Sequence, residues 1–358
     1  CPAPGTPGSC GTAICPACPP LVVLATGTTG LRGTFISSSS PQWTTTTYSD
    51  EPSTDVPNMA ALTASAEAVG LVRRTDDIVR WTRWTPAGFS AWNAPSGAPM
   101  TDPVVLAANS NAYAFVARHP DGEYWQGGLG AGSSSWSYGR VIKWMGPGNW
   151  WLLSGPLPPV VGYTANGVLF AETTGSSLVV WKDTGGYASA TGFSTTTTRL
   201  PALATYFAGS HVRDALFVFQ DNVPVTDQLY WAARQSGAWT SAAMIANAQA
   251  TDQSLLALPN DDFMLVYRDP LAQLHGTRFS GVTGTWSTPQ PVPGNMTAMS
   301  KPSLALGAGD AEVELLFVES VTGNGYHARW FKDATNFTTP VAIPGATGLV
   351  GIAAATVL

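Results

Sequence analysis

The side chains that could carry out catalysis are few and widely spaced. Glu123, Glu172 and Glu319 lie in or beside segments that are predicted to be hairpin turns, and Asp121 lies close to the first of them. Two carboxyl groups can cleave a glycosidic bond when the fold holds them about 5 to 10 Å apart. Acidic residues are also ordinary turn residues, and nothing in the spacing pairs these four. We therefore predict no catalytic residue.

The histidines do not form a metal-binding pattern either. His119, His211, His275 and His327 are far apart in the chain, without the short intervals typical of zinc ligands. No Asp-rich calcium loop occurs, and Asp261-Asp262 is typical of a turn. The sequence predicts neither a metal site nor a cofactor.

All four cysteines fall in a Cys/Pro/Gly-rich N-terminal tail, residues 1–20. They are Cys1, Cys10, Cys15 and Cys18. A short segment of this composition cannot bury a core, so we expect two disulfides formed in an oxidising compartment. A zinc site that uses Cys15 and Cys18 is an alternative. A lipid anchor on Cys1, as in bacterial lipoproteins, is another.

The composition restricts the partners and the location. Only 11% of the 358 residues are charged, the formal net charge is -6, and Lys and Arg together number 17. Nucleic-acid binding needs a basic stripe that this chain lacks. No run of 18 apolar residues occurs, so no transmembrane segment is predicted. We expect a secreted or cell-surface protein.

A repeat of about 49 residues runs along the chain from residue 21. Each copy contains an apolar run, a hairpin turn, a β-rich segment such as Leu229-Tyr230-Trp231, and a closing aromatic residue. Periodic recurrence of this kind is typical of propellers and solenoids, and it suggests that the aromatic residues pack between repeats. The closing aromatic residues are Trp43, Trp92, Trp136, Tyr187, Trp239, Trp286 and Phe337.

Most repeats also begin with a strand rich in small residues, as in Ser303-Leu-Ala-Leu. Small side chains suit the crowded axis of a radial assembly. The first repeat lacks this strand, whereas the segment 351–358 is an unassigned strand of the same character. We predict an all-β fold: a seven-bladed β-propeller over residues 21–358, with four-stranded antiparallel blades and a ring closed by the C-terminal strand joining the N-terminal blade.

Two segments resemble the blade repeat of a known family. The residues from Thr75 to Trp92 and from Gln228 to Trp239 are similar to the repeat of bacterial and fungal propeller lectins that bind fucose and related sugars. The resemblance extends over the propeller and excludes the tail. It implies a propeller fold and sugar binding, but the repeats here diverge from one another, so it assigns no binding residue.

Sialidase propellers are a more distant comparison. Their Asp-box, Ser-x-Asp-x-Gly-x-x-Trp, is approached by the segment from Ser280 to Trp286. Val282 stands where the Asp belongs, and the Trp comes one residue early. A sialidase-like glycoside hydrolase is therefore an alternative to a lectin-like binding protein without catalysis. A structural subunit of an extracellular assembly, linked through the tail, is a second alternative.

Three tryptophans that depart from the period are the first candidates for ligand binding. Trp144, Trp150 and Trp151 lie with Asn149 in the Pro-bracketed segment 143–159, between the third and fourth repeats. Flat aromatic faces beside polar groups are suited to stacking on sugar rings. The alternative is that these tryptophans fill the boundary between two blades.

Three arginines are the second candidates. Arg74, Arg118 and Arg268 each end the second strand of a repeat, and together they could hold the carboxylate of an anionic sugar. The alternative is that they are solvated residues beside hairpin turns.

Overall fold

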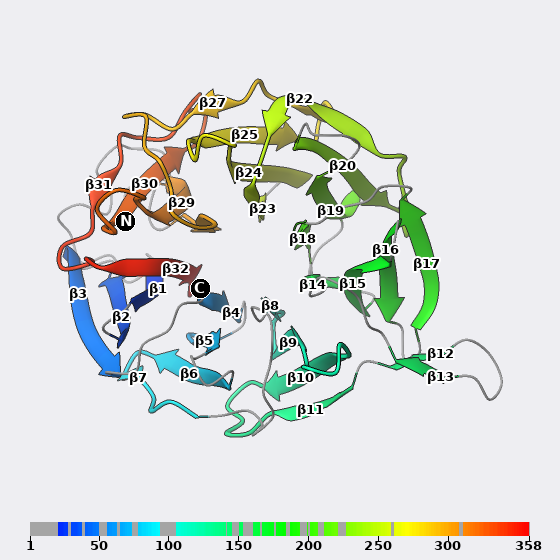
Figure 1. Cartoon of the computed structure of the whole chain (residues 1–358), viewed down its shortest axis with the longest axis horizontal. Coiled ribbons are helices and arrows are strands. Elements are labelled where there is room, and N and C mark those ends of the chain that lie inside the picture. The colour runs from blue at the N-terminus through cyan, green and yellow to red at the C-terminus, as the bar shows by residue number, and fades with distance from the viewer. Residues whose placement is uncertain are drawn as a thin grey trace.

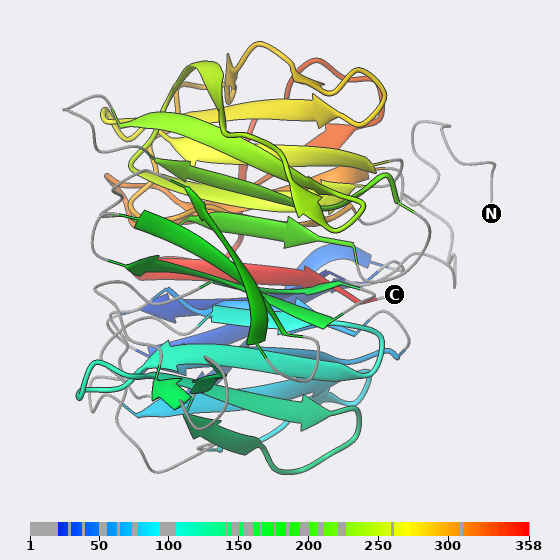
Figure 2. The ribbon, with the colours of Figure 1, turned by 90° about the vertical axis from the view of Figure 1, so that its right-hand side faces the viewer.

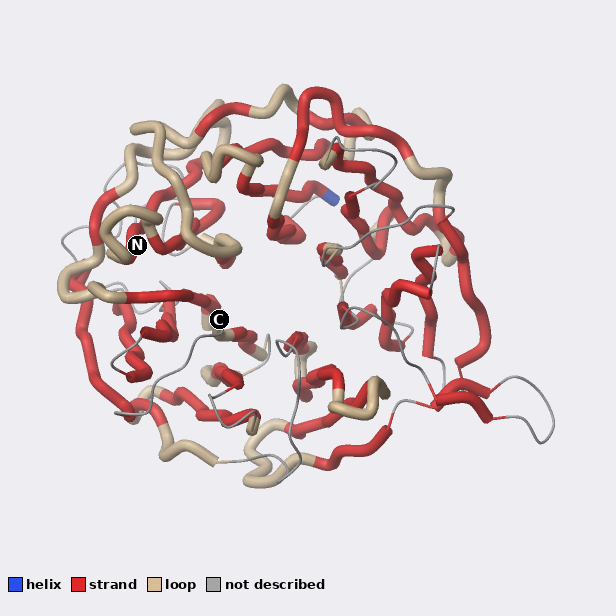
Figure 3. The backbone as a smooth tube through the Cα atoms, viewed as in Figure 1, coloured by secondary structure: helices blue, strands red, loops and turns tan. Residues whose placement is uncertain are grey.

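The computed structural model consists almost entirely of strands and loops (Figure 3). This confirms the all-β prediction. No described segment forms a helix long and apolar enough to cross a membrane. The structure describes residues 21–357 apart from short gaps, and for several strands near these gaps it describes the backbone alone. The gaps are 28–29, 38–39, 50–55, 63–64, 74–77, 94–104, 141, 145–149, 153–159, 165–166, 175–176, 184–186, 194–198, 200, 207–210, 221–226, 259–260 and 308–310.

The described strands form antiparallel sheets that stand side by side around a central axis (Figure 1). Sheet 1 contains β32 (Leu349–Thr356), β1 (Leu21–Gly27), β2 (Gly30–Ser37) and β3 (Ser40–Ser49). Sheet 2 contains β4 (Asn58–Ala61), β5 (Ala68–Arg73), β6 (Val79–Thr85) and β7 (Gly88–Phe89). Sheet 3 contains β8 (Val105–Ala108), β9 (Ala112–Arg118), β10 (Tyr124–Gly130) and β11 (Ser137–Arg140). A separate hairpin follows, made of β12 (Ile142–Trp144) and β13 (Trp150–Leu152).

The second half of the chain continues the same pattern. Sheet 4 contains β14 (Val160–Thr164), β15 (Gly167–Thr174), β16 (Ser177–Asp183) and β17 (Tyr187–Phe193). Sheet 5 contains β18 (Ala202–Thr205), β19 (Arg213–Gln220), β20 (Gln228–Gln235), β21 (Ala238–Trp239) and β22 (Ala243–Gln249). Sheet 6 contains β23 (Asp252–Leu258), β24 (Asp262–Arg268), β25 (Leu274–Ser280), β26 (Thr285–Trp286) and β27 (Gln290–Pro291). Sheet 7 contains β28 (Ser303–Leu306), β29 (Ala311–Val318), β30 (Gly325–Phe331) and β31 (Val341–Ala342).

The innermost strands of the seven sheets form a closed circuit. In order around the axis they are β32, β4, β8, β14, β18, β23 and β28, and each contacts the next. Several are rich in alanine, as the sequence predicted for strands at a crowded centre. The architecture is an all-β propeller with antiparallel blades.

The C-terminal strand joins the N-terminal sheet, which confirms the predicted closure. β32 pairs antiparallel with β1, with Leu24 opposite Ala353, and lies beside the N-terminal strands in both ribbon views (Figures 1 and 2). The packing is close here: a Cβ atom on Gly351 would lie 2.7 Å from the Cα atom of Val56. With β32 paired to it, β1 is no longer the inner edge of sheet 1, and β32 takes the innermost position that its small residues suit.

The hydrophobic core is divided among the spaces between neighbouring sheets. One cluster joins sheets 2 and 3, another joins sheets 6 and 7, and a third joins sheet 7 to sheet 1 through Leu316, Val318, Leu21, Val23 and Ile352. Sheet 7 is therefore covered by sheet 6 on one face and by sheet 1 on the other.

Two of the periodic aromatic residues, Trp136 and Trp286, pack between sheets, as predicted from their spacing. Trp136 of sheet 3 lies edge-on to Trp81 of sheet 2, with ring centroids 6.0 Å apart. Trp286 of sheet 6 has the same relation to Trp231 of sheet 5 at 6.4 Å. These two closing tryptophans are therefore part of the scaffold.

Two sheets differ from the expected four strands. β22 pairs with β20 in sheet 5, and β27 pairs with β25 in sheet 6, so each sheet gains a short fifth strand. Both strands come from the connection that leads to the next sheet. The period of the sequence predicts the positions of the main strands. It does not predict that a connection pairs with a strand of the preceding sheet.

A core substitution in β32 tests the contribution of ring closure. Ile352 is 1% exposed and packs between sheets 1 and 7. We expect Ile352→Ala to lower the free energy of unfolding by about 3 kcal/mol, because it leaves a cavity at this boundary. Urea denaturation measures the change. Val282→Ala, at a side chain that is 90% exposed, is the control and should change stability little. Equal stability of the two variants would show that the packing of β32 contributes nothing.

Candidate ligand-binding site

The predicted aromatic platform lies on the small hairpin outside the ring. Trp144 ends β12, and Trp150 and Trp151 begin β13 (Figure 1). Trp144 is opposite Trp150, whereas Trp151 is opposite Lys143. The role of the three tryptophans in ligand binding stays a prediction.

Several other predicted residues lie outside the described part of the chain. They are Asn149, Arg74, Cys1, Cys10, Cys15 and Cys18. The disulfide, zinc and lipid interpretations of the tail therefore stay predictions.

The predicted arginines are not brought together where the structure describes them. Arg118 ends β9 of sheet 3 and Arg268 ends β24 of sheet 6, and these two sheets are not neighbours in the ring. The Arg268 guanidinium donates to the Asp252 carboxylate at 2.5 Å, to the Met299 carbonyl at 2.8 Å and to the Thr251 hydroxyl at 3.0 Å. These bonds join sheet 6 to the start of sheet 7. A ligand-binding role for the arginines stays a prediction.

Among the candidate acids, Glu319 closes the turn between β29 and β30. Its carboxylate accepts hydrogen bonds from the backbone N–H groups of Val321 at 2.9 Å and Thr322 at 2.7 Å, and from the Thr322 hydroxyl at 2.8 Å. Burial favours the neutral acid, but these donors favour the carboxylate and hold the pKa of Glu319 below its usual value. The geometry agrees with the interpretation of Glu319 as a turn residue.

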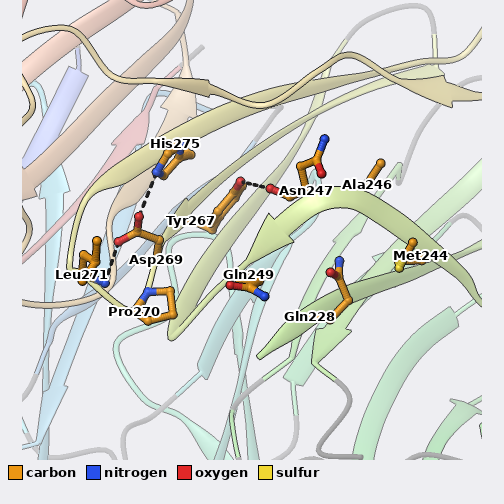
Figure 4. A pocket seen from close by; sticks show the side chains of 10 residues that line it. All are labelled: Gln228, Met244, Ala246, Asn247, Gln249, Tyr267, Asp269, Pro270, Leu271 and His275. Carbon is orange, nitrogen blue, oxygen red and sulfur yellow. Dashed lines mark hydrogen bonds and ion pairs between the residues drawn. The ribbon is translucent and has the colours of Figure 1, made fainter. Parts of the chain in front are cut away.

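A cavity of about 550 Å³ lies between sheets 5 and 6, and the sequence did not point to it (Figure 4). We call it cavity I. One wall comes from the end of β24 and the start of β25, and the other from β20 and β22. Its volume is within the range of small-molecule sites. The lining includes Gln228, Asn247, Gln249, Tyr267, Asp269 and His275.

Tyr267, His275 and Asp269 form one connected group in cavity I. The Tyr267 and His275 rings are stacked, with centroids 5.3 Å apart and planes 12° apart. The His275 Nε2 atom lies 3.0 Å from the Asp269 carboxylate, which also accepts from the backbone N–H groups of Leu271 and Gln273 at 2.8 Å. Asp269 therefore fixes both the turn and the imidazole ring.

The Tyr267 hydroxyl stays protonated in this setting. Burial raises the pKa of Tyr267 above its ordinary value, and the nearby Asp269 carboxylate raises it further. Cavity I is therefore lined by a neutral hydroxyl, which lies 3.5 Å from the Asn247 carbonyl oxygen, by three side-chain amides and by an imidazole ring. Such groups bind through hydrogen bonds and ring contacts, and no nucleophile paired with a base is present among these residues.

The opposite wall of cavity I is a bulge in β22. Gln228 is opposite Gln249, but Tyr230 is opposite Met244, so β22 has extra residues between these pairs. The Gln228 side-chain amide donates to the Ile245 carbonyl at 2.6 Å and to the Ala248 carbonyl at 2.8 Å, which holds the bulge in shape. Asn247 is exposed on the bulge with φ of 60°, a left-handed conformation that asparagine adopts more readily than most residues.

Weak signals for this site were present in the sequence. Asp269-Pro270 follows its strand as His119-Pro120 follows another, and the segment from Ala243 to Gln249 is a long connection. Neither signal shows that the turn after Arg268 and the segment from Ala243 to Gln249 lie on opposite sides of one cavity. No group of His, Cys, Asp and Glu side chains in the described residues is arranged to hold a metal ion.

Solved structures share the fold. The BP39L lectin from Burkholderia pseudomallei matches with a TM-score of 0.66 and 13% identity, over 90% of this chain and 95% of the lectin. A protein from Lactobacillus plantarum matches with a TM-score of 0.58 and 12% identity, over 94% of this chain and 99% of that protein. The fucose-specific lectin from Aleuria aurantia matches with a TM-score of 0.50 and 13% identity, over 82% and 96%. No protein-family model and no curated protein sequence matches the chain. The predicted resemblance to propeller lectins is thus confirmed for the fold.

Removing the charge of Glu319 tests its role in the turn. In Glu319→Gln the amide N–H₂ group would face backbone donors, so we expect a loss of about 1.5 kcal/mol of stability at neutral pH. A carboxyl group with a lowered pKa stabilises the fold above its ordinary pKa of 4.5, and this contribution disappears as the pH falls through the folded value. Denaturation from pH 7 to pH 3 should therefore show the two proteins converging at low pH. A pH-independent difference would contradict this role.

Proposed function

We propose that this protein binds carbohydrate without catalysis, through cavity I between sheets 5 and 6. The observation that carries the proposal is the combination of stacked rings with amide and hydroxyl groups in one cavity of small-molecule size. Apolar C–H faces of a sugar suit the rings, and its hydroxyl groups suit the amides. Two of the structures that share the fold are lectins, one of them fucose-specific, and this supports a sugar as the ligand.

The ring pair of cavity I differs from its counterparts elsewhere in the repeat. Phe317 stacks on Tyr326 in sheet 7, and Phe219 stacks on Tyr230 in sheet 5. In sheet 6 the same positions hold Tyr267 and His275. The pair is therefore part of the scaffold in these three sheets, but in sheet 6 the first ring carries a hydroxyl and the second is an imidazole.

The finer architecture and the location are also proposals. We propose that each of the seven sheets is one blade, giving a seven-bladed ring, and that the protein is secreted or held at a cell surface. The support for that location is the low content of charged residues and the cysteine-rich segment at residues 1–20. The β12–β13 hairpin, in which Trp144 is paired opposite Trp150, is proposed as a second contact for the glycan or for a surface protein.

Asn247 provides a direct test of cavity I. Asn247→Gly removes the side chain amide and keeps a residue that tolerates the positive φ. We expect binding to the glycans that the protein selects on a glycan array to weaken about tenfold, as the loss of a well-made hydrogen bond implies. Titration calorimetry with the strongest array ligand measures the affinity.

Asn295→Gly is the matched control for this variant. Asn295 is also exposed and has φ of 50°, but it does not line cavity I. Its replacement should leave binding unchanged. Failure of the wild-type protein to bind any glycan, or equal binding by the two variants, would refute the proposed site.

A further inference from the structure

A second cavity adjoins cavity I on the other side of the β22 bulge. This cavity II has a volume of about 310 Å³, and its lining shares Met244, Ala246 and Asn247 with cavity I. The two cavities therefore meet along one short segment. Ile245 and Ala248 of this segment are buried and hold it against sheet 5, while Ala246 and Asn247 are exposed between the cavities.

The lining of cavity II is aromatic and rich in hydroxyl groups. Trp231 and Trp286 both contribute to it, together with Thr285, Ser287 and Thr288. The indole Nε1 atom of Trp286 is buried and has no hydrogen-bond acceptor in the protein. The indole nitrogens of Trp92 and Trp136, two other closing tryptophans, are in the same state, so this is a feature of the repeat rather than of cavity II.

The charges of the side chains that line the two cavities favour a neutral ligand. Neither lining contains Lys or Arg, and Asp269 is the carboxylate in cavity I. The carboxylate of a sialic or uronic acid, or a sulfate group, would be desolvated there without a strong cationic partner and close to a negative charge. His275 is the one basic side chain in the two linings, and its Nε2 atom already contacts Asp269.

We propose that the two cavities form one site for a neutral oligosaccharide, with one sugar unit in cavity I and a further unit in cavity II across the Asn247 bulge. This inference rests on the proposed function and specifies its ligand class. A monosaccharide would fill one cavity and leave the other to water. An oligosaccharide gains the contacts of both, and its second unit binds at the high effective concentration that the glycosidic link imposes.

The repeat provides a matched pair of variants for cavity II. Thr288 follows Trp286 in the segment Trp-Ser-Thr-Pro, and Thr339 follows Phe337 in the equivalent segment Phe-Thr-Thr-Pro of sheet 7. Both threonines are exposed. Thr288 lines cavity II, and Thr339 lines neither cavity. A tryptophan at either position should be accepted by the fold, and only Thr288→Trp would fill cavity II.

The experiment compares ligands of different length and charge. An array of neutral, sialylated and sulfated glycans first identifies the strongest ligand of the wild-type protein. Calorimetry then measures the affinity of the wild type, Thr288→Trp and Thr339→Trp for that oligosaccharide. The same measurement is made with the methyl glycosides of its component sugars. We expect a neutral oligosaccharide to bind at least about tenfold more tightly than any methyl glycoside. Thr288→Trp should remove this advantage without weakening the methyl glycoside, and Thr339→Trp should change neither affinity.

The outcomes separate the two proposals. If glycans bind but a methyl glycoside is as tight as the oligosaccharide, or Thr288→Trp has no effect, the two-cavity site is overturned and carbohydrate binding stands. Preference for sialylated or sulfated glycans would overturn the neutral ligand class alone. If no glycan binds, the proposed function fails and the inference fails with it. Thermal denaturation of the three proteins, with equal midpoints expected, establishes that the variants fold.

Discussion

Sheets in this ring have two buried faces, and the rest of the structure depends on covering both. Leu315 and Leu316 are consecutive residues of β29, and both are fully buried. Leu315 belongs to the core between sheets 6 and 7, and Leu316 to the core between sheets 7 and 1. Val22 and Val23 of β1 divide in the same way. A sheet with two apolar faces cannot end a row, so the row must close into a ring.

This constraint explains what the sequence predicts well. Strands buried on both faces are continuous apolar runs, such as Leu315-Leu-Phe-Val in β29, so they stand out against the polar turns. The small, apolar segment from Gly351 to Val357 had no sheet of its own in the repeat. An uncovered sheet edge is unfavourable, so we predicted that this segment pairs with the first strand of the N-terminal repeat. In the structure it forms β32, which pairs with β1.

The features that escaped prediction depend on register and on connections. The three tryptophans looked alike in the sequence, which did not show that they belong to a separate hairpin in which Trp144 is paired opposite Trp150. The register of such a pair is not determined by the length of its turn. The pairing of β22 was not predicted for a related reason. Its bulge is held by Gln228 of β20, and the role of Gln228 is apparent only from the contact between β20 and β22.

The candidate site arises where the scaffold and the connection combine. Stacked ring pairs recur in sheets 5, 6 and 7 and serve the packing of strands. The β22 bulge places an open wall opposite the pair of sheet 6, so rings that are scaffold elsewhere line a cavity here. The proposed site thus depends on a connection that folds back beside ordinary repeat positions.

Some of the charged side chains in the described part of the chain join neighbouring sheets. Arg278 of sheet 6 binds Asp262 of its own sheet at 2.6 Å and Glu312 of sheet 7 at 2.8 Å. Arg213 of sheet 5 donates to the Gly281 carbonyl of sheet 6 at 2.8 Å. Guanidinium groups committed to such bonds are poor candidates for holding a free anion, because a ligand would have to compete with acceptors that are already in place. In a chain with 17 Lys and Arg residues, this use of charge is consistent with recognition by amides, hydroxyls and rings.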